Sequence, residues 1–226
     1  MIIDQGSKRT SAGRRRIEAK RARIVEVAER HFAEHGFQAA RVESIAAEVG
    51  VAKGSIFQHF DSKDGLFLAA YRKASSTLPA YMDAGDTVLR RGFFATLEYW
   101  LGRTGHMLHE DWIPYRVTLL GNYGTELRLR REINRYLLSE DPYGTNAFVR
   151  WGIERGEVRD DVPREMIVSL VDWMMNSFQD ALLTQEMDPG IFRDRAAGPE
   201  RTAERIHQFA KLLRSAISRR KFSPDS

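Results

Sequence analysis

The stretch that decides the fold is residues 36–66, GFQAARVESIAAEVGVAKGSIFQHFDSKDGL. It divides at Gly50 into two short segments with apolar residues at helical spacing, residues 42–49 and 53–60. The small Ala46 lets the two helices approach closely, and Gly50 supplies the backbone freedom that a tight turn needs. This pattern predicts a helix-turn-helix, in which the second helix enters the major groove of DNA.

Helical periodicity continues on both sides of this stretch. We expect a first helix over about residues 15–35, ended by Gly36, and a fourth helix capped by Asp61 or Ser62. The residues predicted to form the core of the two short helices are Val42, Ile45, Val49, Val51, Ile56 and Phe60. After residue 80 the pattern predicts longer helices at about 86–109, 112–138, 143–156, 163–186 and 200–220, with a loop at 187–199.

Three blocks resemble the N-terminal domain of the TetR/AcrR family of transcriptional regulators. They are HFAEHGF at 31–37, IAAEVGVAKGSIFQHF at 45–60 and SKDGLF at 62–67, in matching order and spacing. The resemblance implies an all-α fold with a three-helix DNA-binding domain followed by a larger helical effector-binding and dimerisation domain. The expected division is a disordered basic arm at 1–13, the helix-turn-helix domain at 14–75 and the second domain at 76–226.

The resemblance also implies which residues contact DNA. The expected contacts are Arg41, Lys53, Gly54, Ser55, Phe57, Gln58, His59 and Lys63. Gln58 is suited to reading adenine through a bidentate hydrogen bond, and Lys63 at the start of the next helix is suited to a phosphate. Phe57 stands where the family usually has tyrosine, so the hydroxyl that would bind a phosphate is missing. Arg41 replaces a capping threonine but adds a positive charge, and Ala52 replaces a common serine.

Charge is concentrated in the first third of the chain. Residues 1–75 hold 14 Lys and Arg against 9 Asp and Glu, whereas the remaining residues hold 21 against 22. A basic segment attracts DNA phosphates, although a solvated charged surface is the plain alternative. The N-terminal arginines either enter a minor groove, as homeodomain arms do, or act as a non-specific electrostatic tether, which we favour.

Composition excludes several other classes. The 226 residues include no cysteine, which excludes disulfides and thiolate chemistry, and no apolar run of membrane-spanning length. No signal-peptide pattern follows the basic N-terminus, so we expect a cytoplasmic protein without a cofactor. No GxxxxGK[ST] or GxSxG motif is present, and we expect no enzymatic activity.

The second domain is rich in aromatic residues and methionines that would line an apolar effector pocket, although ordinary core packing is the alternative for each. The pocket candidates are Trp100, Arg103, Met107, Trp112, Tyr115, Tyr123, Phe148, Trp151, Met174 and Phe178. Family members pair their last two helices in a homodimer. The corresponding interface candidates are Met166, Leu170, Trp173, Phe209, Leu213 and Ile217.

The predicted function is therefore a ligand-responsive DNA-binding regulator, a repressor that binds a palindromic operator as a homodimer and is released by a small molecule. One alternative is a helical small-molecule-binding or interaction protein that does not bind DNA. Another is a metal-dependent helical enzyme, for which the pairs His31 with His35 and His106 with His109 are the only suggestive spacings. No third ligand accompanies either pair, so we expect no metal.

Overall fold

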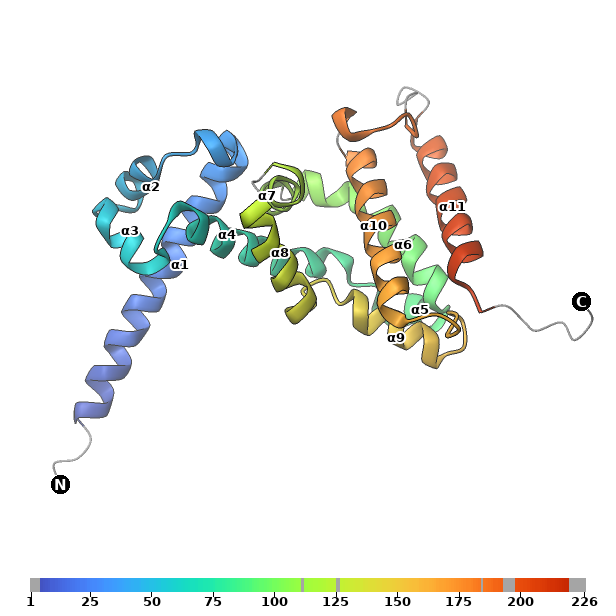
Figure 1. Ribbon diagram of the computed structural model, residues 1–226, viewed down its shortest axis with the longest axis horizontal. Helices are drawn as coiled ribbons and strands as arrows, with labels where there is room; N and C mark the ends of the chain where they lie inside the picture. The colour runs from blue at the N-terminus through green and yellow to red at the C-terminus, as the bar shows by residue number, and fades with distance from the viewer. Residues whose placement is uncertain (1–4, 111, 125–126, 184, 193–197, 220–226) are drawn as a thin grey trace, which may run out of the picture. The chain divides into compact units, whose positions relative to one another are not determined.

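The computed structural model describes residues 5–110, 112–124, 127–183, 185–192 and 198–219, and its regular elements are helices (Figure 1). Within those ranges the only strand-type pairing is an isolated bridge between Val158 and Ser218. The all-α prediction is confirmed. None of the helices in the same ranges combines the length and the apolar character needed to cross a bilayer.

The chain forms two compact units, one of residues 1–77 with 113–138 and the other of residues 78–112 with 139–226. We call them the head and the body. The head contains α1 (Gln5–Ala39), α2 (Val42–Val49), α3 (Lys53–Phe60), α4 (Lys63–Thr77), α7 (Trp112–Tyr123) and α8 (Leu127–Glu140). The body contains the 3₁₀ turns η1 (Leu78–Met82) and η2 (Gln185–Met187), with α5 (Gly85–Arg90), α6 (Phe93–Glu110), α9 (Thr145–Glu154), α10 (Arg164–Leu183) and α11 (Gly198–Ile217).

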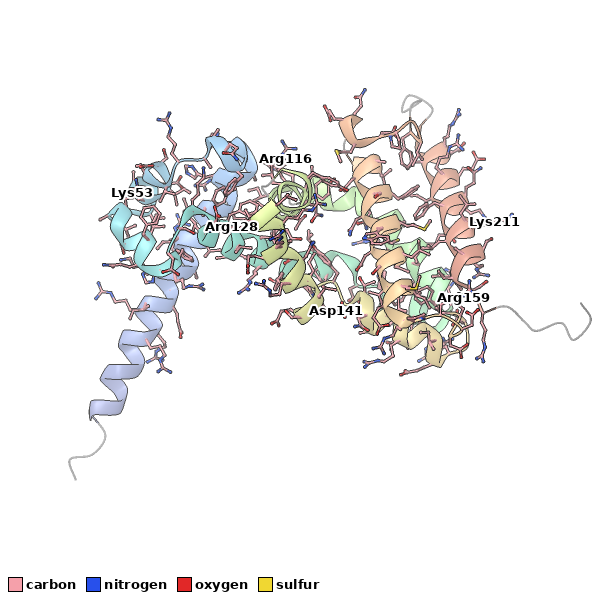
Figure 2. The ribbon with its side chains drawn as sticks, in the orientation of Figure 1. Lys53, Arg116, Arg128, Asp141, Arg159 and Lys211 are labelled. Carbon is pink, nitrogen blue, oxygen red and sulfur yellow. The ribbon has the colours of Figure 1, made fainter. Side chains whose placement is uncertain are left out.

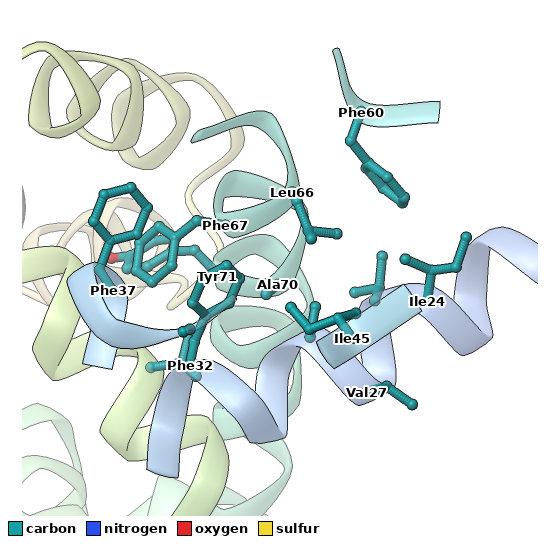
Figure 3. Packing of buried hydrophobic residues seen from close by; sticks show 14 of the residues in the cluster. Ile24, Val27, Phe32, Phe37, Ile45, Phe60, Leu66, Phe67, Ala70 and Tyr71 are labelled. Carbon is teal, nitrogen blue, oxygen red and sulfur yellow. The ribbon is translucent and has the colours of Figure 1, made fainter. Parts of the chain in front are cut away.

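The head is built around one apolar cluster, shown in Figure 3. The ring of Phe67 on α4 makes edge contacts with Phe32 and Phe37 of α1, at centroid distances of 5.0 and 5.1 Å. Ile45 of α2 and Ile56 of α3 are fully buried in the same cluster. The first four helices therefore pack against one another, and the inner face of α3 is buried in this packing.

The boundaries of the short helices agree with those predicted. Gly50 has φ 75° and ψ 37°, and the Val51 N–H donates to the carbonyl of Ala46 at 2.9 Å, which ends α2. The Ser62 hydroxyl accepts the Gly65 N–H at 3.0 Å and so caps α4. Gly36, with φ 76°, breaks the regular path of α1 where the sequence predicted a stop.

The start of α1 differs from the prediction. Residues 5–13, expected to belong to a disordered arm, continue α1 as helix. Residues 14–23, which follow directly, are mostly arginine, lysine, alanine and glutamate. Because these residue types favour helix, they support its continuation toward the N-terminus.

The compact units also divide the chain differently from the predicted boundary at residue 75. Residues 113–138 pack with the head, because one side of α4 is buried against them. The Tyr71 hydroxyl donates to Asn122 Oδ1 at 3.3 Å, and Ser75 shares a hydrogen bond with the Tyr136 hydroxyl at 3.1 Å. A Cβ at Gly121 would lie 2.4 Å from the Tyr71 ring, so only glycine permits this approach.

In the body, α10 and α11 both pack on α6, and the Phe178 and Phe209 rings stack at 4.0 Å between α10 and α11. The helix predicted over 86–109 is two helices separated at Gly92, which has φ 100°. The Glu157 carboxylate accepts the Phe93 N–H at 2.9 Å and occupies the space that a Cβ at Gly92 would need. The helix predicted over 112–138 likewise ends at Tyr123 and resumes at Leu127.

Candidate nucleic-acid interface

The two faces of α3 differ in burial. Ile56 and Phe60 are buried against α2 and α4, while Lys53, Gly54 and Gln58 are exposed. Figure 2 shows Lys53 at the outer surface of the head. The helix thus presents a polar outer face of the width that a major groove admits. Of the other predicted contacts, Arg41 is exposed at the N-cap of α2, and Ser55, Phe57, His59 and Lys63 are half-buried.

Lys53 is held by an anion on the neighbouring helix. Its Nζ donates to Glu43 Oε1 at 2.6 Å and lies 5.5 Å from the centroid of the Phe57 ring. This hydrogen bond lowers the pKa of Glu43, so the carboxylate is charged at neutral pH. Glu43 therefore places a negative charge beside a residue expected to contact phosphate, which sequence inspection did not recognise.

Ser55, in the first turn of α3, is reached by α1. Lys20 Nζ donates to Ser55 Oγ at 2.9 Å, across 35 residues of sequence. One turn further along α3, the Arg21 guanidinium lies 5.0 Å from the centroid of the Phe60 ring. Two basic side chains of α1 thus lie against α3, although neither was among the predicted site residues.

Lys63 has a structural partner. Its Nζ donates to the Gln38 carbonyl at 3.0 Å and lies 5.0 Å from the centroid of the Phe37 ring, so it ties the start of α4 to the end of α1. Burial lowers the pKa of Lys63. A phosphate contact by Lys63 remains a prediction, and the residue also contributes to the packing of the head.

Gly65 positions α4 against α3. A Cβ at this position would lie 2.0 Å from the Phe60 carbonyl oxygen, a backbone atom that cannot move aside cheaply. The glycine of the SKDGLF block is therefore required by the close approach of two helices. A glycine in the first turn of an amphipathic helix was the available signal, because glycine is unfavourable there without a packing reason.

A third group of contacts joins α1 to α2. Arg30 and His31 of α1 both contact the Glu48 carboxylate, His31 through Nε2 at 2.9 Å. His31 also lies against His35, with ring centroids 5.7 Å apart. Among the side chains that the structure describes, no three His, Asp or Glu residues are grouped closely enough to hold a metal ion. The side chains of His106 and His109 lie outside the described residues.

Residues 24–70, which include α2, α3 and the packed part of α1, match the family described as bacterial regulatory proteins, tetR family. The chain therefore carries the N-terminal domain of this family. It is 27% identical over 164 residues to the HTH-type transcriptional repressor AcnR of Corynebacterium diphtheriae, an alignment covering 72% of this chain and 80% of the relative.

Solved TetR-type structures share the fold. A TetR transcriptional regulator from Chloroflexus aurantiacus superposes with a TM-score of 0.56 at 22% identity, covering 91% of this chain and all of the other. The regulator FadR of Bacillus subtilis, solved with stearoyl-CoA, gives a TM-score of 0.59 at 19% identity, covering 87% and 98%. These similarities support the fold of a TetR regulator along nearly the whole chain.

The ligand-pocket candidates fall into separate places. Trp100, Phe148 and Trp151 meet in the body: the Phe148 ring lies 4.4 Å from Trp100 and 5.6 Å from Trp151, and it stacks on Phe93 at 4.2 Å. Phe178 instead fills the body core against Phe209, and Met174 packs against that core. Tyr115 and Tyr123 belong to the head, Trp112 is exposed at the start of α7, and the Met107 side chain lies outside the described residues.

The interface candidates also divide. Met166 and Trp173 of α10 are 63% and 70% exposed, and Leu170, on the same side of that helix, is half-buried. Leu213 and Ile217 of α11 are buried in the body core, so they are not available to a second copy of the chain. The exposed apolar residue on α11 is Leu212, at 66%. An amphipathic helix with leucines at adjacent positions does not reveal in sequence which of them is outside.

Proposed function

We propose that this TetR-family chain is a transcriptional repressor that binds a palindromic operator as a homodimer and leaves DNA when a small molecule binds the body. The observation that carries the proposal is the polar, exposed outer face of α3 on a helix whose inner face is buried. The repressor name of the AcnR relative supports the direction of regulation. A DNA target supports a cytoplasmic location.

Dimerisation is supported by the apolar face that α10 and α11 leave uncovered. Met166, Leu170 and Trp173 recur at intervals of four and three residues, so they form one stripe along α10. On α11, which contacts α10 through the stacked Phe178 and Phe209 rings, Leu212 is a further exposed apolar residue. A symmetric dimer would carry two copies of α3, and a palindromic operator offers two half-sites in successive major grooves, about 34–36 Å apart on DNA.

An effector site in the body is supported by Arg103 on α6, the helix that also carries Trp100. Arg103 follows Trp100 by one helical turn, and its Nε is buried without a hydrogen-bond partner among the described residues. Because leaving a buried guanidinium nitrogen unpaired is costly, Arg103 is suited to a polar group of the effector. We propose Phe148 and Trp151 as the neighbouring apolar wall of that site.

A band-shift experiment with the DNA upstream of the protein's own gene tests the DNA-binding function. We expect saturable binding, competition by a palindromic subfragment but not by random DNA, and an affinity that falls steeply between about 50 and 200 mM salt. A helical binding protein that does not recognise DNA would give no preference for that fragment. A thermal-shift screen then seeks the effector; long-chain acyl-CoA esters are included because the Bacillus subtilis neighbour was solved with one.

A further inference from the structure

The N-terminal part of α1 is a basic helix with no covering element. Every residue from Gly13 to Arg23 is exposed, and this segment holds six Lys or Arg against the single acidic residue Glu18. Figure 1 shows this part of α1 extending beyond α2, α3 and α4 as an unbroken helix. A helix with this composition has no apolar face to bury, so packing within the head does not explain it.

The contact between Lys20 and Ser55 determines which side of this helix is turned toward α3. Arg16 precedes Lys20 by four residues and Arg23 follows it by three, so the three side chains share one side of α1. We call them the α1 basic row. Lys20 Nζ lies 2.9 Å from Ser55 Oγ, so the row passes the first turn of α3 and continues outward through Arg16. Arg23 at its inner end is also paired with Glu26, at 3.0 Å.

We propose that the α1 basic row binds the DNA phosphate backbone flanking the bases that α3 reads. This inference rests on the proposed DNA-binding function and adds a second, sequence-independent contact to it. A phosphate that reaches the first turn of α3 at Ser55 is followed along the same strand by others, each with a rise of about 3.4 Å along the duplex axis. The row spans seven residues, about 10 Å of helix, and so is long enough to reach more than one phosphate of that strand.

The sequence leaves two roles open for the N-terminal arginines, which are entry into a minor groove and electrostatic contact outside it. The helical form of this segment decides between them. An α-helix with its side chains is about 10–12 Å across, whereas the minor groove is about 6 Å wide. A helix therefore cannot enter the minor groove as an extended homeodomain arm does. It runs against the backbone on one fixed side, and Arg16 makes the outermost contact of the row.

Two single substitutions separate this contact from general electrostatic attraction. Arg16→Gln removes a charge from the row, and Arg15→Gln removes the same charge from roughly the opposite side, about 140° round the helix from Lys20. Glutamine and arginine have similar helix propensities, so α1 remains helical in both variants, which circular dichroism verifies. Neither residue has an interaction that competes with DNA in the described structure.

Binding is measured by fluorescence anisotropy over about 50–200 mM salt, on an operator with flanks of about ten base pairs and on one trimmed at the half-site edges. On the flanked duplex we expect Arg16→Gln to reduce the slope of log K against log salt by about 0.9 for each phosphate that the variant no longer neutralises. Arg15→Gln should match the unaltered protein, and trimming the duplex should abolish the difference between the two variants.

Hydroxyl-radical footprinting gives the second readout. The unaltered protein should protect flanking sugars that Arg16→Gln leaves open. Equal reductions in slope for the two variants, or an unchanged slope for Arg16→Gln on flanked DNA, would overturn the proposed contact while leaving operator recognition intact. Failure of the unaltered protein to prefer any operator would instead overturn the function on which the contact rests.

Discussion

At the scale of single residues, the basic side chains expected to attract DNA phosphates are also paired with groups of the head. The Lys53 ammonium can pair either with Glu43 or with a group in front of α3. The Lys63 ammonium can pair either with the Gln38 carbonyl or with solvent. Their availability to a phosphate depends on partners in the head. The family resemblance predicted the residue types of the site. It did not predict the pairing of Glu43 with Lys53, because Glu43 lies ten residues away on the preceding helix.

Glu43→Gln should tighten DNA binding. The substitution removes an anion next to the DNA and frees the Lys53 ammonium for a phosphate. Exposed pairs of this kind are weak, so we expect a gain of only about twofold to fivefold in affinity and a steeper salt dependence. Anisotropy titrations at two salt concentrations check this, with Glu186→Gln, at an exposed position of the body, as a control of equal charge. Weaker binding by Glu43→Gln would mean that Glu43 orients Lys53 for DNA.

Asp172 provides a prediction about pH. Burial raises the pKa of this carboxyl, Asp141 adds to the rise, and the hydrogen bond from Thr145 Oγ1 at 2.6 Å opposes it. Because the folded state favours the protonated form, stability is lost as pH rises from the ordinary Asp pKa of about 3.9 through the raised value. Asp172→Asn should therefore raise Tm at pH 7, and the gain should disappear below about pH 3.9.

Thermal unfolding between those pH values measures the Asp172 effect. Glu186→Gln, at an exposed position, is the control and should show no such pH-dependent gain. An Asp172→Asn protein that is less stable than the original at pH 7 would show that the charged form is favoured by groups other than Thr145.

At the scale of helices, local pattern located elements better than it located their ends. The bounds of α2 and α3 follow from a glycine and an apolar spacing that lie inside one short stretch. The break at Gly92 depends on the Glu157 carboxylate, 65 residues further on, so no local pattern encodes it. The continuation of α1 to Gln5 was missed because polar composition suggested an unstructured arm, although most of the residues that follow it favour helix.

Gly65→Ala should damage the head, whereas Gly54→Ala should not. The new methyl at residue 65 would collide with the Phe60 carbonyl, and overpacking of this kind costs about 1–3 kcal/mol. A Cβ at Gly54 meets nothing within 4 Å, and alanine favours helix by about 1 kcal/mol. Thermal unfolding distinguishes the two. A Gly65→Ala protein with unchanged Tm would show that α4 can move away from α3 without cost.

At the scale of the whole molecule, the proposed regulation involves a dimer and an effector site in the body. The exposed stripe on α10 was predicted in sequence, but Leu213 and Ile217 of α11 could not be assigned correctly, because their burial depends on the position of α6. The effector site remains the least predictable part, since the rings that would line it also pack on one another.

Trp173→Glu should dissociate the proposed dimer. A buried charge in place of a large apolar side chain at an interface costs about 2 kcal/mol or more, which corresponds to a weakening of at least about thirtyfold. Leu138→Glu is the matched control, because Leu138 is also a highly exposed apolar residue but belongs to α8 of the head. Light scattering across a dilution series measures the assembly state, and a Trp173→Glu protein that remains dimeric would exclude α10 from the interface.

The inclusion of α7 and α8 in the head means that the chain crosses between the two units three times, after residues 77, 112 and 138. The two units are therefore joined by three covalent connections instead of one. Cleaving the chain at one crossing would leave the units joined by the other two. A fragment ending at residue 77 would lack the partners of Tyr71 and Ser75 and would fold less stably than the head within the full chain.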